Sequence, residues 1–209
     1  MRTVILDYGL CNLLSVHNAL KFLGIEALVT GDPEALRSAD RAILPGVGAF
    51  ADGMRGLRSK GLVGPIHAYV RTGRPFLGIC LGMQFLMTKS HEFGEHEGLG
   101  IIPGETVNLK DGPQAQGLRV PHIGWNGLHD AGRPWEGTLL AGLPQGAEMY
   151  FVHSFHTVPA DPSHALAVTE YGPRRFCSVI ARDNVHGCQF HPEKSAALGL
   201  KILKNFVDL

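Results

Sequence analysis

Cys80 lies in a sequence context that suits a nucleophilic thiol. It stands between an apolar run at 76–79, which predicts a buried strand, and a run at 81–87, which predicts a helix. Gly78 and Gly82 flank it at two positions on each side, the spacing of a nucleophile elbow, where glycine lets neighbouring backbone pass without Cβ clashes. The N-terminus of the following helix would also favour a thiolate. We interpret Cys80 as a candidate nucleophile, with a small core residue as the alternative.

A base and a carboxylate that can orient it are available in the segment His191, Pro192 and Glu193. Pro192 favours an extended conformation for the residue before it, and residues two apart on an extended chain point to the same side. The Glu193 carboxylate can therefore reach the imidazole, fix its tautomer and stabilise the imidazolium that forms when a thiol is deprotonated. Taken alone, the segment is weak evidence, because a strand end at the surface often carries polar residues.

Acyl transfer to a thiol also requires donors for the oxyanion of the tetrahedral intermediate. The backbone N–H of Leu81 is one candidate, because it directly follows the candidate nucleophile. The loop 45–48 is the other, with Gly46 and Val47 able to turn their N–H groups toward a ligand. From local sequence an ordinary Gly-Pro turn explains this loop equally well.

The elements that must position these groups alternate along the first half of the chain. Apolar runs predict strands at 3–6, 27–29, 42–44 and 76–79, and helical spacing predicts helices at 12–23, from Pro33 onward, at 62–70 and at 81–87. From 89 to about 147 the sequence has short β-like pieces such as 106–109 but no clean periodicity. Periodicity then returns in strands at 148–152, 166–169, 177–181 and 185–190 and a helix at 195–207. We predict an α/β fold: a three-layer sandwich around a central, mostly parallel sheet with a β-rich insertion, formed by one domain over 1–209.

The composition excludes several classes of function. Nineteen Lys and Arg balance nineteen Asp and Glu, so no strong positive field attracts nucleic acid or anionic lipid. The longest apolar stretch, 75–87, falls short of the roughly 20 residues that span a bilayer. The N-terminus has no secretory signal pattern, and we therefore expect a cytoplasmic protein without a membrane helix.

Cysteine and histidine spacing gives no indication of a metal centre or a disulfide framework. The four cysteines contain no C-x-x-C pair, and Cys177 and Cys188 fall in predicted strands as core thiols. His91 and His96 are five residues apart across a glycine, with no third ligand evident. We expect no metal and no cofactor.

Two segments resemble the signature motifs of a known family, the class I or triad-type glutamine amidotransferases. They are GICLGMQ at 78–84 and QFHPEKS at 189–195. Within that family, the residues Asp7, Tyr8, Gly9, Asn12, Leu13 and Ser15 and the segments PGVGAF at 45–50 and HIGWN at 122–126 resemble the branch of glutaminase subunits of imidazole glycerol phosphate synthase. The resemblance covers nearly the whole chain.

This resemblance implies a reaction and a partner. Cys80 would attack the side-chain amide of glutamine to form a γ-glutamyl thioester, and His191, oriented by Glu193, would act as general acid for the departing ammonia. The ammonia would pass to a (βα)8-barrel cyclase subunit, bound as a heterodimer, that makes imidazole glycerol phosphate and aminoimidazole carboxamide ribotide in histidine biosynthesis. The loop 45–48 would reorganise when the partner binds its substrate, completing the oxyanion hole.

The resemblance also assigns substrate and interface residues. The glutamine-binding residues implied are Gln84, Gly48, His153, Ser154 and Phe155, and the interface residues implied are Asn12, Trp125 and Lys194. One position departs from the branch: Cys11 stands where glycine is usual, so a positive φ there would strain the turn or change it.

Three other functions remain compatible with the residues. The chain could serve a different amidotransferase, could be a related thiol hydrolase that cleaves γ-glutamyl or peptide bonds, or could be a non-catalytic binding subunit with a vestigial elbow. Glutamate release abolished by Cys80→Ala would distinguish the first from the last, and activity without a partner would indicate the hydrolase.

Overall fold

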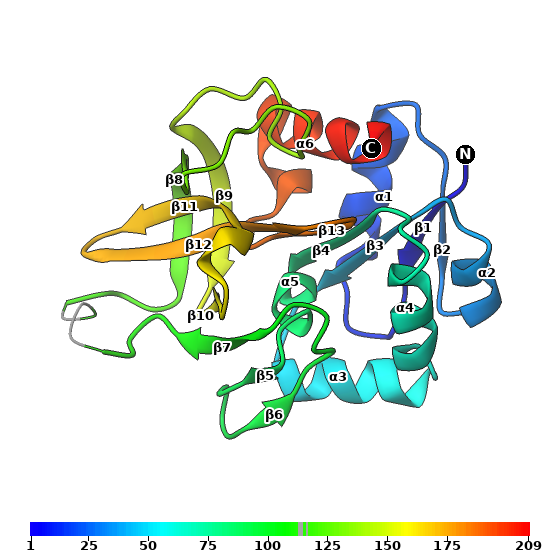
Figure 1. Ribbon diagram of the computed structural model, residues 1–209, viewed down its shortest axis with the longest axis horizontal. Coiled ribbons are helices and arrows are strands. Elements are labelled where there is room, and N and C mark those ends of the chain that lie inside the picture. Colours follow the sequence, from blue (N-terminus) through cyan, green and yellow to red (C-terminus); the bar gives the residue numbers. More distant parts are fainter. Residues whose placement is uncertain (113–114, 116) are drawn as a thin grey trace.

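The computed structural model describes residues 1–112, 115 and 117–209. A central sheet lies between two helical layers, with α1 and α6 above it and α3 and α4 below it in Figure 1. The helices are α1 (Leu13–Phe22), α2 (Pro33–Arg37), α3 (Phe50–Ser59), α4 (Val63–Val70), α5 (Leu81–Phe85) and α6 (Ala196–Asp208), with 3₁₀ turns η2 (Pro162–His164) and η3 (Pro192–Lys194). Among these helices none has both the length and the apolar character needed to cross a membrane.

Five neighbouring strands of the sheet are parallel. Their order is β2-β1-β3-β4-β13, and they are β1 (Thr3–Leu6), β2 (Ala27–Thr30), β3 (Arg41–Gly46), β4 (Phe76–Cys80) and β13 (Val185–Cys188). Their carboxyl ends meet at one edge of the sheet, where Gly46 pairs with Cys80. That edge is where parallel α/β sheets bind ligands.

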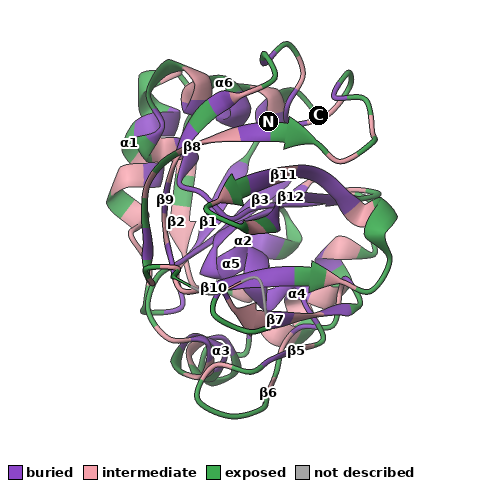
Figure 2. Cartoon of the chain, turned by 90° about the vertical axis from the view of Figure 1, so that its left-hand side faces the viewer, coloured by how far each residue is buried: buried purple, intermediate pink, exposed green. Residues whose placement is uncertain are grey.

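Both faces of β1, β3, β4 and β13 are buried because helices cover each side, whereas the edge strand β2 is only partly buried. Alternate residues of a strand face opposite ways, so Ile5 packs with α1 and α6, whereas Val4 and Leu6 pack with α3 and α4. Figure 2 shows the buried residues concentrated along the central strands. The predicted α/β three-layer sandwich is confirmed.

The rest of the sheet is largely antiparallel. It consists of β5 (Lys89–Ser90), β6 (His96–Glu97), β7 (Gly104–Asn108), β8 (His122–Asp130), β9 (Ala147–His153), β10 (Phe155–Pro159), β11 (Ala165–Tyr171) and β12 (Arg174–Arg182). β12 pairs antiparallel with β13, which is where the parallel strands end. The sheet as a whole is therefore mixed, and its parallel character is concentrated in the five strands that lead to Cys80.

Several local features differ from the sequence-based expectations. Helix α3 was not predicted, and neither were the long strand β8 and the strand β10. The strand expected at 185–190 ends at Cys188, and Gln189 and Phe190 continue outside it toward η3. Most other predicted elements occur with boundaries shifted by one to three residues.

Candidate active site

Cys80 lies on a sharp turn between β4 and α5. Its φ of 54° and ψ of −111° are strained for a residue with a side chain. A Cβ on Gly78 would lie 2.6 Å from the carbonyl oxygen of Gly82, and a Cβ on Gly82 would collide with the carbonyl of Leu44. Glycines at both positions are therefore required for the strand and helix to approach so closely.

His191 and Glu193 lie side by side on the turn that follows β13. The imidazole Nδ1 donates to Glu193 Oε1 at 2.8 Å, and both side chains are almost completely buried. The Ser195 hydroxyl donates to the His191 carbonyl at 2.6 Å and accepts from the Tyr150 N–H at 3.0 Å, while the His191 N–H donates to the Tyr150 carbonyl. These bonds fix the turn to β9, and with it the direction of the imidazole.

Opposing effects set the protonation of His191. Burial acts to lower its pKa, but the neighbouring Cys80 sulfur and the Glu193 carboxylate favour the charged ring more strongly. The pKa is raised to about 10, so the ring is an imidazolium at neutral pH. Its Nε2 is buried and makes no hydrogen bond within the described residues, which leaves one N–H available for proton transfer.

A cavity of about 350 Å³ opens in front of the thiol and the imidazole. This volume is at the small end of the range of about 300–1,000 Å³ typical of ligand pockets. It is lined by residues expected from the sequence, namely Val47, Gly48, Cys80, Leu81, Gln84, His153, Ser154, Phe155 and His191, and by the further residues Glu92, Pro121 and Val152. Glu193 lies behind His191, and Gly46 lies at the end of β3 beside Cys80.

Glu92 is the charged residue in this wall that sequence reasoning missed. Its Oε2 accepts the N–H of Phe50, the first residue of α3, at 2.5 Å, which fixes the carboxylate beside the loop 45–48. Burial raises the pKa of Glu92 despite that hydrogen bond. No local motif marks the residue, because it comes from a short connection between β5 and β6 and reaches the pocket only through the fold.

Comparison with known proteins identifies the family. A model of the family described as glutamine amidotransferase class-I matches residues 4–209. The chain belongs to the class I glutamine amidotransferases. It is 51% identical over 208 residues to an imidazole glycerol phosphate synthase subunit HisH of Syntrophotalea carbinolica, with 99% of each chain covered. It is 48% identical to a subunit HisH 1 of Legionella pneumophila, with 98% of each covered, and 49% identical to a subunit HisH of Aquifex aeolicus, covering 99% and 96%.

Solved structures support the fold independently. A structure titled as PurLQS from Thermotoga maritima superposes with a TM-score of 0.74 at 18% identity, covering 99% of this chain and 97% of that one. A crystal structure of a glutamine amidotransferase gives a TM-score of 0.72 at 20% identity, covering 99% and 97%. At these identities the likeness is one of fold alone.

In this amidotransferase His153 forms the inner wall of the cavity. Its Nδ1 lies 2.8 Å from the carbonyl oxygen of Phe155, so this nitrogen must carry the proton. Burial lowers the pKa of His153 to about 3, and the ring is neutral at physiological pH. It therefore shapes the wall without adding charge, and Nε2 faces His122 at 3.1 Å.

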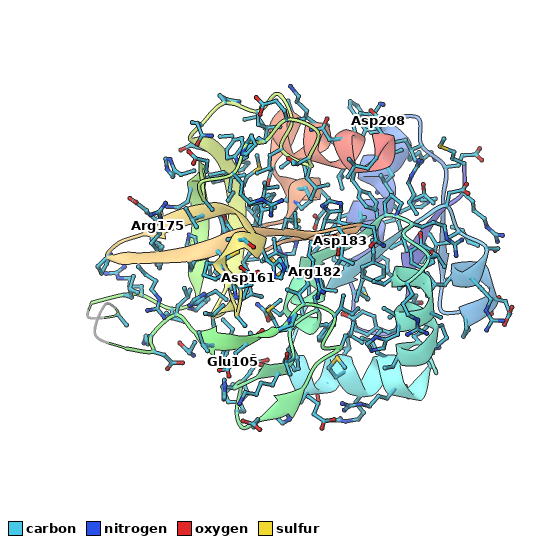
Figure 3. All side chains as sticks on the ribbon, in the orientation of Figure 1. Glu105, Asp161, Arg175, Arg182, Asp183 and Asp208 are labelled. Atoms are coloured by element: carbon cyan, nitrogen blue, oxygen red, sulfur yellow. The ribbon has the colours of Figure 1, made fainter. Side chains whose placement is uncertain are left out.

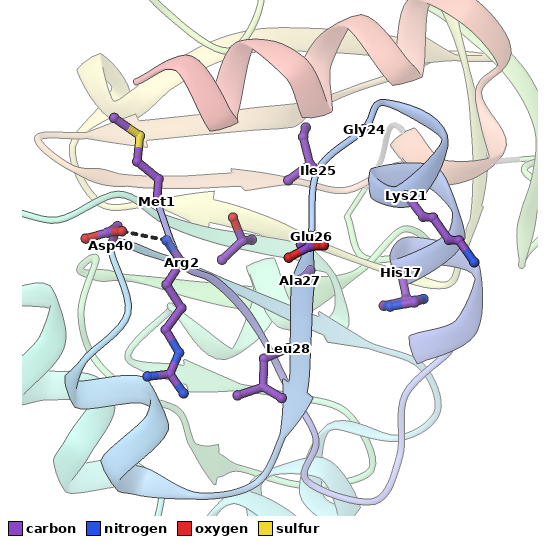
Figure 4. A pocket seen from close by; sticks show the side chains of 11 residues that line it. Met1, Arg2, His17, Lys21, Gly24, Ile25, Glu26, Ala27, Leu28 and Asp40 are labelled. Carbon is purple, nitrogen blue, oxygen red and sulfur yellow. Dashed lines mark hydrogen bonds between the residues drawn. The ribbon is translucent and has the colours of Figure 1, made fainter.

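A second, larger hollow of about 920 Å³ lies at the opposite end of the sheet (Figure 4). It surrounds the amino end of β1 and is lined by charged side chains such as Arg2, Lys21 and Glu26. Because Cys80 and His191 belong to the carboxyl edge, the larger hollow contains none of the candidate catalytic groups. Size alone therefore does not identify the site.

The three expected interface residues lie on η3 or beside elements that contact it. Trp125 is half exposed on β8, pairs with Tyr150 of β9, and its ring centroid lies 5.9 Å from that of Tyr150. Asn12 immediately precedes α1, which packs against η3, and Lys194 is exposed on η3 itself.

Cys11 is not among the residues with positive φ, so a cysteine at this position introduces no backbone strain of that kind.

Charged side chains elsewhere lie mostly on the surface, although that of Arg41 is buried. Figure 3 shows labelled examples on loops and strand ends, including Arg182 and Asp183, which pair at 3.8 Å. In the part of the chain that the structure describes, no group of three or more His, Cys, Asp and Glu side chains is arranged to hold a metal ion. The cavity chemistry thus comes from a thiol, an imidazole, carboxylates and amides.

Proposed function

We propose that this chain is the glutaminase subunit of an imidazole glycerol phosphate synthase, hydrolysing L-glutamine to L-glutamate and ammonia. The observation that carries the proposal is the buried His191–Glu193 pair beside Cys80 at the strained turn. Relatives that share about half of its residues over their full length are named as subunits of that synthase. The site supports acyl transfer, and the relatives support glutamine and the pathway.

The proposed catalytic residues are Cys80, His191 and Glu193. The Cys80 sulfur attacks the δ-carbon of glutamine, and the carbon–nitrogen bond breaks while the His191 imidazolium gives its proton to the departing nitrogen. Ammonia and a γ-glutamyl thioester result. The neutral His191 then takes a proton from water, which adds to the thioester and releases glutamate, and Glu193 stabilises the imidazolium that re-forms.

The oxyanion hole is proposed to be incomplete in the isolated subunit. Leu81 begins α5, so its backbone N–H belongs to the unpaired first turn and is available to the oxyanion. The N–H of Val47 donates instead to the carbonyl of Leu10, at 3.4 Å. Gly48, with a φ of +94°, provides the flexible position at which the loop can turn this donor toward Cys80, and Gly46 lies at the other end.

Glutamine is proposed to bind with its α-amino acid end against Gln84, Glu92, Gly48, Ser154 and Phe155. The Glu92 carboxylate supplies the negative charge that an α-ammonium group requires, and Gly48 and Ser154 supply backbone groups on the same wall. The neutral His153 adds shape to the wall without competing for the ammonium. The cavity is small, which favours a single amino acid over a peptide.

The ammonia is proposed to pass to a (βα)8-barrel cyclase subunit in a cytoplasmic heterodimer. Asn12, Trp125 and Lys194 are the proposed contacts: Lys194 lies on the turn that holds His191, Asn12 precedes α1, which contacts that turn, and Trp125 pairs with Tyr150 of β9, which also contacts it. Leu10, two residues before Asn12, and Val47 are partly exposed and are joined by the bond that restrains the oxyanion loop. A partner that contacts Leu10 would therefore act directly on that bond.

The decisive experiment measures glutamate release by the chain alone and with its cyclase. We expect weak turnover alone, stimulation by cyclase plus nucleotide substrate, and complete loss in Cys80→Ala. If the assembled pair released no glutamate from glutamine, the proposal would be wrong. Unstimulated hydrolysis of γ-glutamyl peptides by the isolated chain would indicate a thiol hydrolase instead.

A further inference from the structure

A completely buried amide, that of Gln189, reaches the candidate nucleophile from the side of β13. Gln189 follows the last residue of β13 and precedes His191 by two positions. Its backbone N–H donates to the Ser178 carbonyl at 2.9 Å, and its side-chain Nε2 lies 3.7 Å from Cys80 Sγ, within hydrogen-bond range for sulfur. None of the roles described above uses this side chain.

The orientation of the Gln189 amide follows from its neighbours. Gln84 Nε2 lies 3.0 Å from the carbonyl oxygen of Phe155, and because a carbonyl can only accept, Gln84 must present its NH₂ there. The same Gln84 NH₂ lies 3.2 Å from the side-chain amide of Gln189, which must therefore accept through its Oε1. The remaining end of Gln189, the NH₂, is then necessarily the one that faces the sulfur.

We propose that Gln189 is a further catalytic residue, whose amide N–H donates to Cys80 Sγ and stabilises the thiolate, and that Gln84 is the positioning residue that aims it. This rests on the proposed role of Cys80 as nucleophile. A donor to the charged sulfur favours thiolate over thiol, as hydrogen bonds to an ionised form generally do. Burial strengthens the effect, because Gln189 is inaccessible to water that would compete for the bond.

The amide has an advantage over the imidazole in this role. His191 must give up its proton to the leaving nitrogen, so a thiolate stabilised only by the imidazolium would lose that support during the reaction. An amide does not titrate and retains its N–H through both half-reactions, including the step in which the thiolate must leave the thioester. The Gln189 NH₂ lies 3.7 Å from the sulfur, so it supplies a donor in addition to the neighbouring imidazolium, whose pKa the sulfur raises.

The arrangement also links the nucleophile to the substrate pocket. Gln84 lines the cavity and, through its NH₂, holds both the Phe155 carbonyl and the Gln189 oxygen. Its own oxygen remains for a donor of the bound amino acid. Occupation of the pocket would therefore order the amide pair and, through it, the donor to the sulfur.

The test is the pH dependence of Cys80 alkylation by iodoacetamide in the chain alone, with site-resolved mass spectrometry separating Cys80 from the other three cysteines. Gln189→Glu preserves the volume and the acceptor toward Gln84 but replaces the donor with an acceptor. We expect the alkylation midpoint to rise by about one pH unit or more, a tenfold loss of thiolate at a given pH. Gln189→Met, which removes both groups, should raise it by about one unit.

Matched controls separate this role from mere packing. Thr169→Val removes a buried side-chain hydrogen bond, to the Gly127 carbonyl, that lies away from the thiol, and should lower stability without moving the midpoint. Gln84→Met leaves the Gln189 NH₂ in place but removes the side-chain amide that orients it. We expect a smaller rise in the alkylation midpoint for this variant. Folded Gln189 variants with a midpoint within about 0.3 units of the parent would overturn the proposal. The assay requires neither glutamine nor cyclase, so it remains informative even if the proposed glutaminase activity were absent.

Discussion

At the level of single residues, His191 is held at three points, two on its backbone and one on its ring. The Tyr150 carbonyl and the Ser195 hydroxyl bind its backbone, whereas Glu193 binds its ring. The backbone bonds determine where the imidazole lies. The carboxylate contributes to its charge, which is the property that a general acid requires.

Glu193→Gln should remove the negative charge that favours the His191 imidazolium while preserving the size of the side chain. The pKa of His191 should fall from about 10 toward its ordinary value of 6.5, so the imidazolium is lost as pH rises through neutrality. We expect kcat to fall by about 10²- to 10⁴-fold, as for other general acids and their orienting carboxylates. Glutamate release of the assembled synthase across pH 5 to 10 measures both effects. An alkaline limb unchanged from the parent would contradict this role.

Glu92→Gln tests the wall of the pocket. The oxygen of glutamine can still accept the Phe50 N–H, so the start of α3 should persist, whereas the negative charge facing an α-ammonium is lost. We expect KM for glutamine to rise by about tenfold or more with kcat little changed, since a charged hydrogen bond contributes about 1.5–3 kcal/mol. Glu95→Gln is the matched control, because Glu95 is exposed on the same connection and pairs with Lys89. An equal change in both variants would exclude a specific contact.

The sequence is informative about the site to different degrees. Cys80 and the His191–Glu193 pair could be predicted because their roles depend on spacing within a few residues. Glu92 and Gln189 could not be assigned their contacts, because these depend on distant segments: Phe50 for the first, Gln84 and Cys80 for the second. A residue that works through tertiary neighbours leaves no local pattern.

At the level of elements, α3 shows why one helix escaped prediction. Its N-cap residue is Ala49, which offers no side-chain acceptor, and Glu92 from a distant connection supplies one instead. Gly53 and Gly56 inside it weaken the helical pattern. Both glycines have a packing reason: a Cβ on Gly56 would lie 2.6 Å from the carbonyl oxygen of Tyr8, and a Cβ on Gly53 would meet the ring of Phe85. The features that stabilise this helix are therefore contacts with residues distant in the sequence.

Gly53→Ala should therefore destabilise the protein, against the usual helix propensity. The added methyl group must displace the Phe85 ring, which packs edge-on against Phe50. We expect a loss of about 1–3 kcal/mol in the free energy of unfolding, the usual cost of overpacking. Gly64→Ala is the control: it lies in α4 with nothing within 4 Å of an added Cβ, and should stabilise by about 0.5–1 kcal/mol. Urea denaturation of both variants, with opposite signs expected, makes the comparison; two changes of the same sign would contradict it.

At the level of the whole molecule, the site lies where the sheet changes character. Cys80 ends β4, and the turn bearing His191 follows β13, the neighbouring and last strand of the parallel set. Beyond β13 the antiparallel strands supply Tyr150, which anchors that turn. The sequence predicts the parallel half well, because most strands there contain a continuous apolar run. It predicts the other half incompletely: β7, β9, β11 and β12 occur as expected, whereas β8, which is only partly buried and carries no clear alternation, was missed.

Several buried histidines make the folded state sensitive to acid. His156 donates through Nδ1 to the Thr157 carbonyl and accepts from Arg174 through Nε2, so it must be neutral. Burial lowers the pKa of His156 to about 4, that of His186 to about 4 and that of His153 to about 3. These pKa values lie below the ordinary value of 6.5, so the unfolded chain binds the protons first.

The consequence for stability has a definite sign. The contribution of these neutral rings is complete above pH 6.5 and is lost as pH falls from 6.5 toward 4, by up to about 1.4 kcal/mol per pH unit for each ring. His156→Gln, which retains a donor and an acceptor, should reduce the steepness of the acid limb by about one proton. His129→Gln, at an exposed position on β8, should not. Urea denaturation at half-unit intervals from pH 7.5 to 4.5 measures the slope, and an acid limb equally steep in His156→Gln would show that its neutrality does not support the fold.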